Sequence, residues 1–479
     1  MLIQGLAIAH VLVVIGFSIR ILLRDDLSSA ARMAWVMMML FTPYFGFVVY
    51  LLFGEISLGR TVHQRHDEIF AKLQKIAGNA MGSCDRNLED NVETKYQTAF
   101  RAASVDGFGT TLGNRAELLP DAATARARLI EDFDNATESI QCLYYIWLDD
   151  HTGRNVAEAL MRAARRGVTC HVMADGLGSR KFIKSKWWRE MREAGVNLNV
   201  ALPIRWVIDT ILFSRLDLRN HRKITVIDSR ITWCGSQNCA DEAFLVKKKY
   251  APWVDIMLRF EGPVVVQCQL LFGSDWLLNS NDDIPASLQL KTEPMEDGFP
   301  AQLFADGPTD RRGATPQLFA TLLALAIKEV VISTPYFVPS RTVLDAICAA
   351  AIRGVEVTLI FPKLNDSWIV AAASHSYYRQ LLDHGVKIHE FRDGLLHAKT
   401  LTIDRKLSLV GSTNIDLRSF DLNYENDILL RDDEVTENIR DRQLVYIEQS
   451  DSVTLEDVNS WSHSRRIWNN VVATVGPIL

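Results

Sequence analysis

The chain has 479 residues, 48% of them hydrophobic, and it carries 58 acidic against 52 basic side chains, for a formal net charge of −6. A chain of this length and apolar content can form two or three domains with their own cores, which excludes a disordered tail protein. The acidic balance argues against bulk binding of nucleic acid, because a basic surface supplies most of the affinity in that class of protein.

Two apolar segments open the chain. The first, 2–23, contains few polar residues, and the second, 34–53, is twenty residues without a charge. Twenty helical residues rise about 30 Å, which matches the hydrocarbon core of a bilayer. The pattern predicts a two-helix transmembrane hairpin over 1–54. A cleaved signal peptide is the alternative for the first segment, but no basic region precedes its apolar stretch.

A hairpin would place both of its ends on the same side of the membrane. Arg24 and Arg32 compete with the basic residues after the second segment, so positive charge does not decide the orientation. The seven cysteines are scattered, and no two form a Cys-x-x-Cys pair, which favours a reducing compartment over a disulfide framework. We therefore expect a multi-pass membrane protein whose larger part is cytoplasmic.

Residues 55–109, in which charges are spread throughout, predict a helical connector to an internal repeat. In the repeat, an apolar run at 140–147, a helical stretch and a strand at 169–174 recur as 330–336, a second helical stretch and 356–362. Strand, helix and strand in this order indicate βαβ units, which form parallel sheets covered by helices.

The repeat predicts an α/β protein with two pseudo-symmetric lobes, each having a mixed, mainly parallel sheet flanked by helices. We expect the first lobe over 110–277 and the second over 313–479. Residues 278–312 are rich in Asn, Asp, Pro and Gly and are expected to be a linker.

Each lobe carries the motif His-x-Lys-x-x-x-x-Asp. The two copies are His221, Lys223 and Asp228, and His397, Lys399 and Asp404. A serine 15 residues and an asparagine 17 residues after each histidine give Ser236 with Asn238, and Ser412 with Asn414. On a strand, a histidine and a lysine two residues apart share one face. One such pair carries little information, but two matching sets predict a shared catalytic site.

These side chains suit exchange at a phosphodiester. Two lysines can neutralise the phosphate oxygens as point charges, and the serines and asparagines can donate further hydrogen bonds to the substrate. Histidine has an ordinary pKa near 6.5, so one imidazole can attack phosphorus while the other serves as acid and then as base. The scheme needs no metal or other cofactor, and we find no convincing cluster of metal ligands.

The paired motifs resemble the HKD motifs of the phospholipase D superfamily over roughly residues 110 to 479. The two N-terminal segments, the stretch Tyr336-Phe337-Val338-Pro339 and the closing Gly476-Pro477-Ile478-Leu479 are similar to those of bacterial cardiolipin synthases. The segment 460–466 also resembles that family, but no chemistry can be assigned to it.

The resemblance implies that the two lobes form one active site. It implies His221 as the nucleophile that forms a phosphohistidine and His397 as the acid and base, although the sequence alone does not break their symmetry. It also implies Asp255 and Glu425 as the carboxylates that orient the histidines. The aspartates of the two motifs would be structural supports, with ordinary strand-end carboxylates as the alternative.

The resemblance further implies transfer of a phosphatidyl group between two phosphatidylglycerol molecules, giving cardiolipin and glycerol at a bacterial inner membrane. A membrane hairpin would hold the site where both lipids are concentrated. Hydrolysis, transfer to another alcohol, phosphatidylethanolamine as donor, and a homo-oligomer all remain open. The acidic charge disfavours a nuclease, and two complete motifs disfavour a non-catalytic scaffold.

The lobes differ in one insertion. Twenty-five residues separate Gly195 from His221, whereas eleven separate Gly385 from His397. The extra stretch, 203–215, mixes large apolar residues with an arginine near each end, which is typical of interfacial helices. We expect it either to enter the membrane interface and guide lipid, or to cover the lobe junction as a core helix.

Overall fold

The computed structural model describes residues 2–25, 27–54, 60–82, 93–203, 218–280, 282, 290 and 292–474. The chain divides into two compact units, one built mainly from the residues up to Arg60 and a much larger one that begins at Thr61. Apart from its first residue, the predicted insertion at 203–215 lies outside the described residues.

The first unit is helical and has the elements α1 (Leu2–Leu22), α2 (Ser29–Phe41), α3 (Pro43–Val49) and η1 (Tyr50–Gly54). Ser28 caps α2 by accepting a hydrogen bond from the backbone N–H of Ala31 at 3.2 Å. Thr42 has a non-helical backbone and Pro43 begins α3, so the second apolar segment is divided into shorter helices. No helix within the described ranges meets the length and apolarity required of a membrane span, so the predicted transmembrane hairpin over 1–54 is not confirmed.

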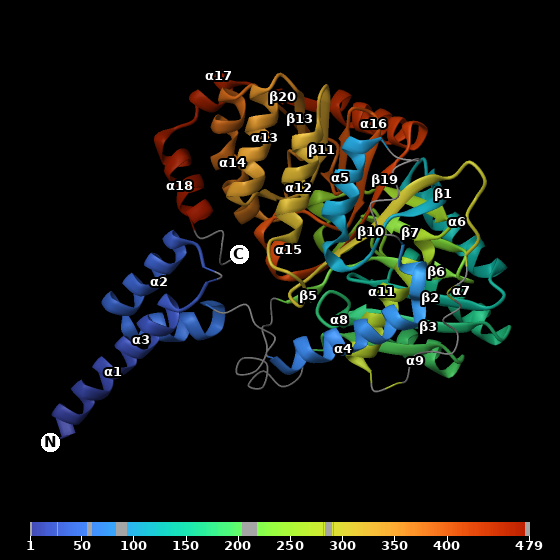
Figure 1. The fold of residues 1–479 in the computed structure, drawn as a ribbon, viewed down its shortest axis with the longest axis horizontal. Helices are drawn as coiled ribbons and strands as arrows, with labels where there is room; N and C mark the ends of the chain where they lie inside the picture. Colours follow the sequence, from blue (N-terminus) through green and yellow to red (C-terminus); the bar gives the residue numbers. More distant parts are fainter. Residues whose placement is uncertain are drawn as a thin grey trace. The chain divides into compact units, whose positions relative to one another are not determined.

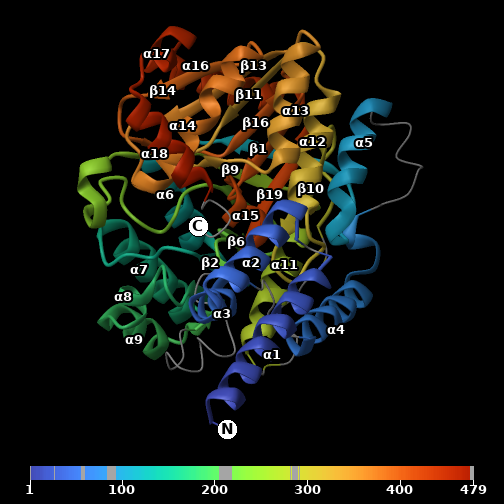
Figure 2. The same cartoon turned by 90° about the vertical axis from the view of Figure 1, so that its left-hand side faces the viewer.

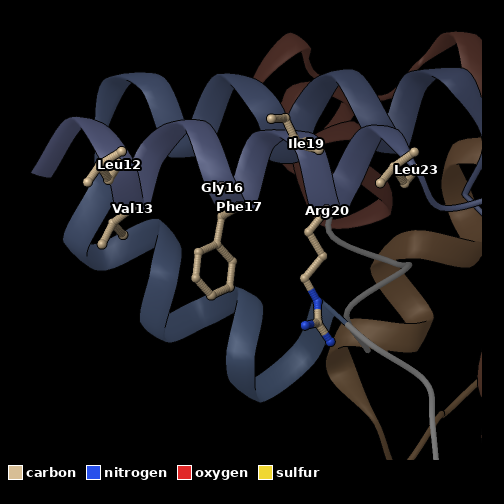
Figure 3. A pocket seen from close by; sticks show the side chains of 7 residues that line it. All are labelled: Leu12, Val13, Gly16, Phe17, Ile19, Arg20 and Leu23. Carbon is tan, nitrogen blue, oxygen red and sulfur yellow. The ribbon is translucent and has the colours of Figure 1, made fainter. Parts of the chain in front are cut away.

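The outside of this unit is rich in apolar side chains. A hollow on α1 is lined by Leu12, Val13, Gly16, Phe17, Ile19, Arg20 and Leu23 (Figure 3). Large apolar residues that are well exposed include Val11, Leu12, Ile15, Ile19, Leu22, Leu23, Met33, Met37, Leu40, Phe41, Tyr44, Phe45, Val48 and Leu51. The unit thus packs a small core of Ile21, Met39 and Tyr50 and leaves most of its apolar surface outside.

The larger unit starts with helices in the range predicted as a connector, namely α4 (Arg60–Ala77), η2 (Gly78–Met81), α5 (Thr94–Ala103) and η4 (Ser104–Asp106). Leu73 of α4 is buried in the central core. Arg65 donates hydrogen bonds to the carbonyl groups of Leu277 and Ser280, at 3.0 and 2.6 Å. These helices are therefore packed parts of the larger unit.

The first lobe consists of β1 (Thr111–Leu118), α6 (Ala122–Asn135), β2 (Ser139–Tyr144), α7 (His151–Arg165), β3 (Thr169–Asp175), α8 (Arg180–Ile183), α9 (Lys186–Glu193), β4 (Asn197–Ala201), β5 (Arg219–Asn220), β6 (Ile224–Ile227), β7 (Ile231–Gly235), η5 (Leu245–Tyr250), β8 (Trp253–Val254), β9 (Met257–Glu261) and α11 (Val264–Asn279).

The second lobe repeats this order with β10 (Phe299–Asp306), α12 (Ala314–Leu325), β11 (Glu329–Ser333), β12 (Phe337–Val338), α13 (Arg341–Ile352), β13 (Glu356–Pro362), α14 (Trp368–Asp383), β14 (Lys387–Phe391), β15 (Leu395–Leu396), β16 (Thr400–Ile403), β17 (Leu407–Gly411), β18 (Ile415–Asp416), α15 (Leu417–Asp421), β19 (Asn423–Arg431) and α16 (Asp433–Glu448), and ends with β20 (Ser450–Val453), α17 (Leu455–Asn459) and α18 (His463–Thr474).

One sheet runs through both lobes in the order β20-β14-β13-β11-β16-β17-β19-β10-β1-β9-β7-β6-β2-β3-β4. Strand β10 pairs antiparallel with β1 on one side and with β19 on the other. The prediction of a linker over 278–312 is therefore wrong for 299–306, which form a mostly buried central strand. The polar residues, prolines and glycine just before this strand favour a loop, so the sequence does not indicate that a buried strand follows.

The sheet is mixed, but the prediction that it is mainly parallel is also wrong. Parallel pairing is confined to β2–β3–β4 and β11–β13–β14 among the long strands. In each lobe the next strand, β6 or β16, runs antiparallel to β2 or β11 and turns back as a hairpin. The βαβ pattern in the sequence thus describes only the outer half of each lobe.

Helices cover both faces of this sheet (Figures 1 and 2). Helices α11 and α16 both contribute to one central core shared by the lobes, with Val266 from α11 and Ile439 from α16 among its members. Helices α6, α7 and α9 enclose a core of the first lobe, and α12, α13 and α14 enclose that of the second. Because these three cores are closely packed, they can hold the loops of the two lobes at fixed positions relative to one another.

Candidate active site

The two His-x-Lys segments cross from one lobe to the other. His221 follows β5, which pairs parallel with the start of β19, and its N–H donates to the Tyr424 carbonyl at 2.9 Å. His397 follows β15, which pairs with β8, and its N–H donates to the Val254 carbonyl at 2.8 Å. Each histidine therefore follows a short strand that is paired with the opposite lobe, and lies just before β6 or β16 begins.

Each imidazole is oriented by a carboxylate from the opposite lobe. Nδ1 of His221 lies 2.8 Å from Oε2 of Glu425, and Nδ1 of His397 lies 2.6 Å from Oδ1 of Asp255. A carboxylate at Nδ1 fixes the ring and leaves Nε2 available for chemistry. The structure thus brings Asp255 and Glu425 to the positions implied by the resemblance, in an exchange between lobes that the sequence did not indicate.

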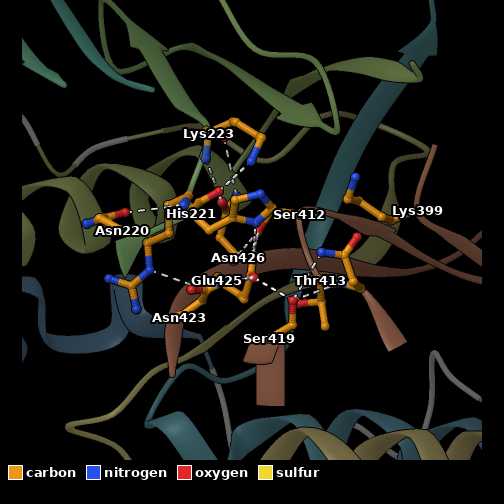
Figure 4. A network of polar contacts seen from close by, with 12 residues as sticks. Asn220, His221, Lys223, Lys399, Ser412, Thr413, Ser419, Asn423, Glu425 and Asn426 are labelled. Atoms are coloured by element: carbon orange, nitrogen blue, oxygen red, sulfur yellow. Dashed lines mark hydrogen bonds and ion pairs between the residues drawn. The ribbon is translucent and has the colours of Figure 1, made fainter. Parts of the chain in front are cut away.

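The serines support these carboxylates. Ser412 Oγ donates to Glu425 Oε2 at 2.5 Å (Figure 4), and Ser236 Oγ donates to Asp255 Oδ1 at 2.7 Å. A hydroxyl group has only one hydrogen to donate. In this geometry both hydrogens are directed at the carboxylates, so the donation of Ser236 and Ser412 to substrate oxygens stays a prediction.

The asparagines differ between the lobes. Asn238 Oδ1 accepts the backbone N–H of Ile146 at 3.1 Å, and its buried Nδ2 has no hydrogen-bond partner among the described residues. Asn414 Nδ2 instead donates to Ser419 Oγ at 3.2 Å, and Ser419 donates to Glu425 at 2.8 Å. Asn238 therefore offers an unused donor to a ligand, whereas Asn414 belongs to the network around Glu425.

The aspartates of the motifs lie at the other end of the strands. Asp228 accepts the backbone N–H groups of residues 137–139 at 2.7 to 2.8 Å, and Asp404 accepts those of residues 327–329 at 2.7 to 3.1 Å. They fix the turns at which β2 and β11 begin, while the histidines lie near the ends of those strands. Their position is that of structural supports and not of groups that touch the substrate.

The two lysines are buried beside the histidines. Lys223 Nζ donates to the carbonyl of His221 at 2.6 Å and Lys399 Nζ to that of His397 at 2.7 Å; both lysines appear with His221 in Figure 4. Burial lowers the pKa of Lys223 to about 8. Burial and the charge of Lys223 lower the pKa of Lys399 to about 7. Burying these two cations costs free energy, and an anion bound beside them would offset that cost.

The surroundings of the histidines favour different protonation states. Burial and the positive charges of Lys223 and Lys399 lower the pKa of His221 well below its ordinary value. Burial and Lys399 also lower the pKa of His397, but the charge of Asp255 opposes them. Burial tends to raise the pKa of Asp255, yet His397 and Lys399 outweigh it and the pKa is lowered, whereas burial raises the pKa of Glu425. The imidazolium form is thus better supported at His397.

Two aromatic side chains lie against the histidines, in roles that the sequence does not predict. The ring of Tyr145 meets His221 edge to face, with centroids 4.9 Å apart. Trp253 lies over His397 at 4.5 Å with an angle of 32°, and Phe244 stacks on Trp253 at 3.9 Å. Trp253 lies two residues before Asp255, a spacing that places both side chains on one side of an extended segment.

Arg222, between His221 and Lys223, anchors the first motif. Its guanidinium donates to Asp275 of α11 at 2.7 Å and to the carbonyl of Glu425 at 3.1 Å. The corresponding position in the second lobe is Ala398. Within the described ranges, no three His, Cys, Asp or Glu side chains are grouped as metal ligands would be.

Comparisons with known proteins agree with this architecture. A family model described as cardiolipin synthase, PLD-like domain, matches residues 129–267 and 319–443, and a phospholipase D-nuclease N-terminal model matches 12–55. The cardiolipin synthase A of Serratia proteamaculans is 35% identical over 468 residues, covering 96% of this chain and 94% of the relative. That of Erwinia tasmaniensis is 34% identical over 471 residues, covering 98% and 96%.

The phosphatidylserine synthase of Haemophilus influenzae Rd KW20 has the same fold, with a TM-score of 0.61 at 15% identity over 81% of this chain and all of that one. The α/β fold with two phospholipase D-like lobes and a mixed sheet is therefore confirmed. On the full-length sequence match and the family model over both lobes, the chain belongs to the cardiolipin synthase family of phospholipase D-like phosphatidyltransferases.

Proposed function

We propose that the protein joins two phosphatidylglycerol molecules into cardiolipin and glycerol, through a phosphohistidine on His221. The observation that carries this proposal is the crossed pair of histidines. Each has Nδ1 held by a buried carboxylate at 2.6 to 2.8 Å and leaves Nε2 available. The relatives named as cardiolipin synthases supply the expectation for the substrate.

In the first half-reaction, Nε2 of His221 attacks the phosphorus of one phosphatidylglycerol. The phosphorus–nitrogen bond forms, the bond to the head-group glycerol breaks, and His397 gives its proton to the departing oxygen. In the second half-reaction, His397 takes a proton from the head-group hydroxyl of another phosphatidylglycerol. That oxygen attacks phosphorus, the phosphorus–nitrogen bond breaks, and cardiolipin leaves with His221 regenerated.

The surroundings of the histidines support this assignment of roles. A nucleophile must be neutral, and the lowered pKa of His221 favours that state. The acid must be protonated, and His397 has an ionised Asp255 at 2.6 Å and the face of an indole at 4.5 Å. An aromatic face within about 6 Å of a cation stabilises the charged form.

The lysines and Asn238 are suited to bind the transferred phosphate. An anion between Lys223 and Lys399 would offset the cost of burying two cations. The unpartnered Nδ2 of Asn238 adds a donor that carries no charge. These groups would stabilise negative charge as it builds up on the phosphate oxygens in the transition state.

The first unit would anchor this site in a bacterial inner membrane, with the catalytic lobes on the cytoplasmic side. Its support is the exposed apolar surface of α1, α2 and α3, since contiguous apolar surface on a folded unit marks contact with a membrane or partner. Resistance of the full chain to extraction from membranes by alkaline carbonate tests this anchoring, and release into the soluble fraction would contradict it.

The test of the function is mass-spectrometric lipid analysis after incubating the purified full chain with phosphatidylglycerol vesicles, beside His221→Ala and His397→Ala. We expect cardiolipin and glycerol from the wild type and neither product from the variants. Phosphatidic acid as the only product would make the protein a hydrolase. Products that require phosphatidylethanolamine would change the donor, and no turnover of any phospholipid would overturn the proposal.

A further inference from the structure

The last helix of the chain leaves an apolar stripe uncovered. On its inner side, α18 buries Asn469 and Val472, and it lies beside α14 (Figures 1 and 2). On its outer side, Ile467, Trp468 and Val471 are each at least half exposed. The spacing of one, three and four residues puts these three side chains on one sector of a helix. Packing within the described chain does not account for this stripe.

The stripe continues onto the start of α14. Trp368 is also more than half exposed, and its ring stacks on that of Trp468 with centroids 5.9 Å apart and an angle of 13°. Two stacked tryptophans on a surface are costly to keep in water, because each removes little of its apolar area by the contact. Such a feature marks a surface that is covered in use.

A third segment joins the same surface. In η5, Leu245 and Val246 are more than half exposed, and Lys247 Nζ donates to Asp366 Oδ2 at 2.6 Å. This ion pair ties η5 to the loop that leads into Trp368. We define the apolar patch by the six exposed residues Leu245, Val246, Trp368, Ile467, Trp468 and Val471.

Basic side chains accompany the patch. Lys248 and Lys249 follow Val246, and Arg465 and Arg466 precede Ile467; all four are exposed. None of the four forms an ion pair with a described acidic side chain. Asp366, in the loop before Trp368, is paired with Lys247. The patch therefore combines apolar and aromatic groups with four basic side chains that form no ion pair among the described residues.

Two of the three segments that carry the patch, η5 and the loop before α14, begin beside the active site. Phe244, directly before η5, stacks on Trp253, which in turn covers His397. Asp366, two residues before Trp368, accepts a hydrogen bond from the hydroxyl group of Tyr336 at 2.6 Å, just beyond the end of β11. The patch thus borders the side of the site on which the acid/base histidine lies.

We propose that this patch seats on a bilayer surface containing anionic phospholipid and holds the opening of the active site against it. The inference rests on the proposed function, because the lipid phosphate must reach histidines that are buried. Tryptophan with aliphatic residues on one side and lysine with arginine around them is the composition of surfaces that enter the membrane interface. Anionic head groups attract such basic clusters.

The first experiment compares two substrates with the full chain. Trp368→Ser/Trp468→Ser and Lys248→Glu/Lys249→Glu are assayed with phosphatidylglycerol in nanodiscs and with short-chain phosphatidylglycerol dispersed in detergent. We expect turnover in nanodiscs to fall roughly ten-fold or more, while turnover of the dispersed lipid stays within about two-fold. Equal loss on both substrates, or no loss on either, would overturn the proposal.

A matched control uses exposed apolar residues near the starts of β11 and β13, at the ends of these strands away from the active site. Ile327 and Ile352 are at least as exposed as the patch residues and lie just before β11 and at the end of α13. The variant Ile327→Ser/Ile352→Ser should leave turnover in nanodiscs unchanged. An equal loss in this control would show that surface apolarity in general, and not this patch, governs activity.

A second readout is independent of turnover, so that it still decides if phosphatidylglycerol is not the substrate. Tryptophan fluorescence of the wild type and of Trp368→Phe/Trp468→Phe is measured in nanodiscs that contain brominated phosphatidylglycerol. We expect the emission that the variant lacks to be the part that the bromine atoms quench. If that emission is unquenched, the patch does not touch lipid.

Dissociation of a dimer by Trp368→Ser/Trp468→Ser at unchanged turnover would instead assign the patch to contact between copies and overturn the proposal.

Discussion

In the first lobe the residue between the catalytic histidine and lysine is Arg222, which is buried and paired with Asp275, whereas in the second lobe it is Ala398. Tyr145 meets His221 with its edge, but Trp253 covers His397 with its face. Glu425 serves one histidine and the shorter Asp255 the other. The strands that carry the two motifs have the same pairing, as Ile140 opposite Ile227 and Val330 opposite Ile403 illustrate.

The difference teaches that a duplicated framework does not imply two equivalent halves. A symmetric site would give two histidines of equal basicity, and either of them could serve as nucleophile or as acid. Here the residues that contact the two histidines break the symmetry, because the charged groups and aromatic rings around each imidazole are different. The experiments below test whether this asymmetry also divides the chemical roles.

The largest effects are expected at the histidines themselves. His221→Ala and His397→Ala should each lower cardiolipin formation about 10⁴-fold or more, since nucleophile and acid act as one unit. A phosphatidyl ester of p-nitrophenol separates the roles, because that leaving group needs no proton. His397→Ala should still release a burst of nitrophenol stoichiometric with enzyme, and His221→Ala should not. A burst from His221→Ala alone would exchange the two assignments.

The carboxylates come next. Asp255→Asn and Glu425→Gln keep the size of each side chain but remove the charge at Nδ1, and each should lower turnover roughly 10²- to 10³-fold. We expect Asp255→Asn to have the larger effect on cardiolipin and little on the nitrophenol burst, because it serves the acid. Glu425→Gln should slow the burst itself. Equal effects on both substrates would show that the carboxylates only hold the fold.

The arginine unique to the first lobe should act mainly on stability. Arg222→Met leaves Asp275 buried without its cationic partner, and breaking a buried ion pair costs about 3–5 kcal/mol in the free energy of unfolding. The double variant Arg222→Met/Asp275→Asn should recover much of that loss, since no unpaired charge remains. Urea denaturation of the full chain in detergent measures both. A double variant less stable than Arg222→Met would contradict this account.

The sequence predicts those parts of the site that depend on residues close together in the chain. It does not predict contacts between residues that only the fold brings together. The histidines and lysines are found because the motif lies within one segment and occurs twice. The partner of a serine hydroxyl depends on residues brought close by the fold. The sequence therefore predicts that Ser236 and Ser412 donate to the substrate, whereas in the structure both donate to carboxylates. The exchange of Asp255 and Glu425 between lobes follows from β5–β19 and β8–β15 pairing, which has no local signature.

The fold shows the same division. The repeat predicts two lobes because its period is visible in the apolar runs, but the antiparallel strands of each lobe follow one another without the βαβ spacing that reveals a parallel pair. Strand β10 was hidden because acidic residues and prolines precede it. Tyr145 and Trp253 gave no signal at all, because an aromatic residue in an apolar strand is most often a core residue.

The smallest predicted effect is a shift in the pKa of His397, and it tests directly how the surroundings of the two histidines differ. Around His397 the charged groups are Asp255, which favours its protonation, and Lys399 and Lys223, which oppose it. Removing the indole face with Trp253→Leu should lower the pKa of His397 further, by about half to one pH unit. The acid would then lose its proton at lower pH, and the alkaline limb of kcat/KM should move toward acid by that amount.

Two variants make this shift diagnostic. Trp253→Phe retains an aromatic face and should restore the alkaline limb to within a few tenths of a pH unit. Tyr145→Leu removes the ring beside the other histidine, which meets His221 edge to face, and should leave that limb where it is. A structural role for Trp253 would lower turnover without moving the limb. A shift of equal size in Tyr145→Leu would mean that both histidines titrate together and that the lobes are chemically equivalent after all.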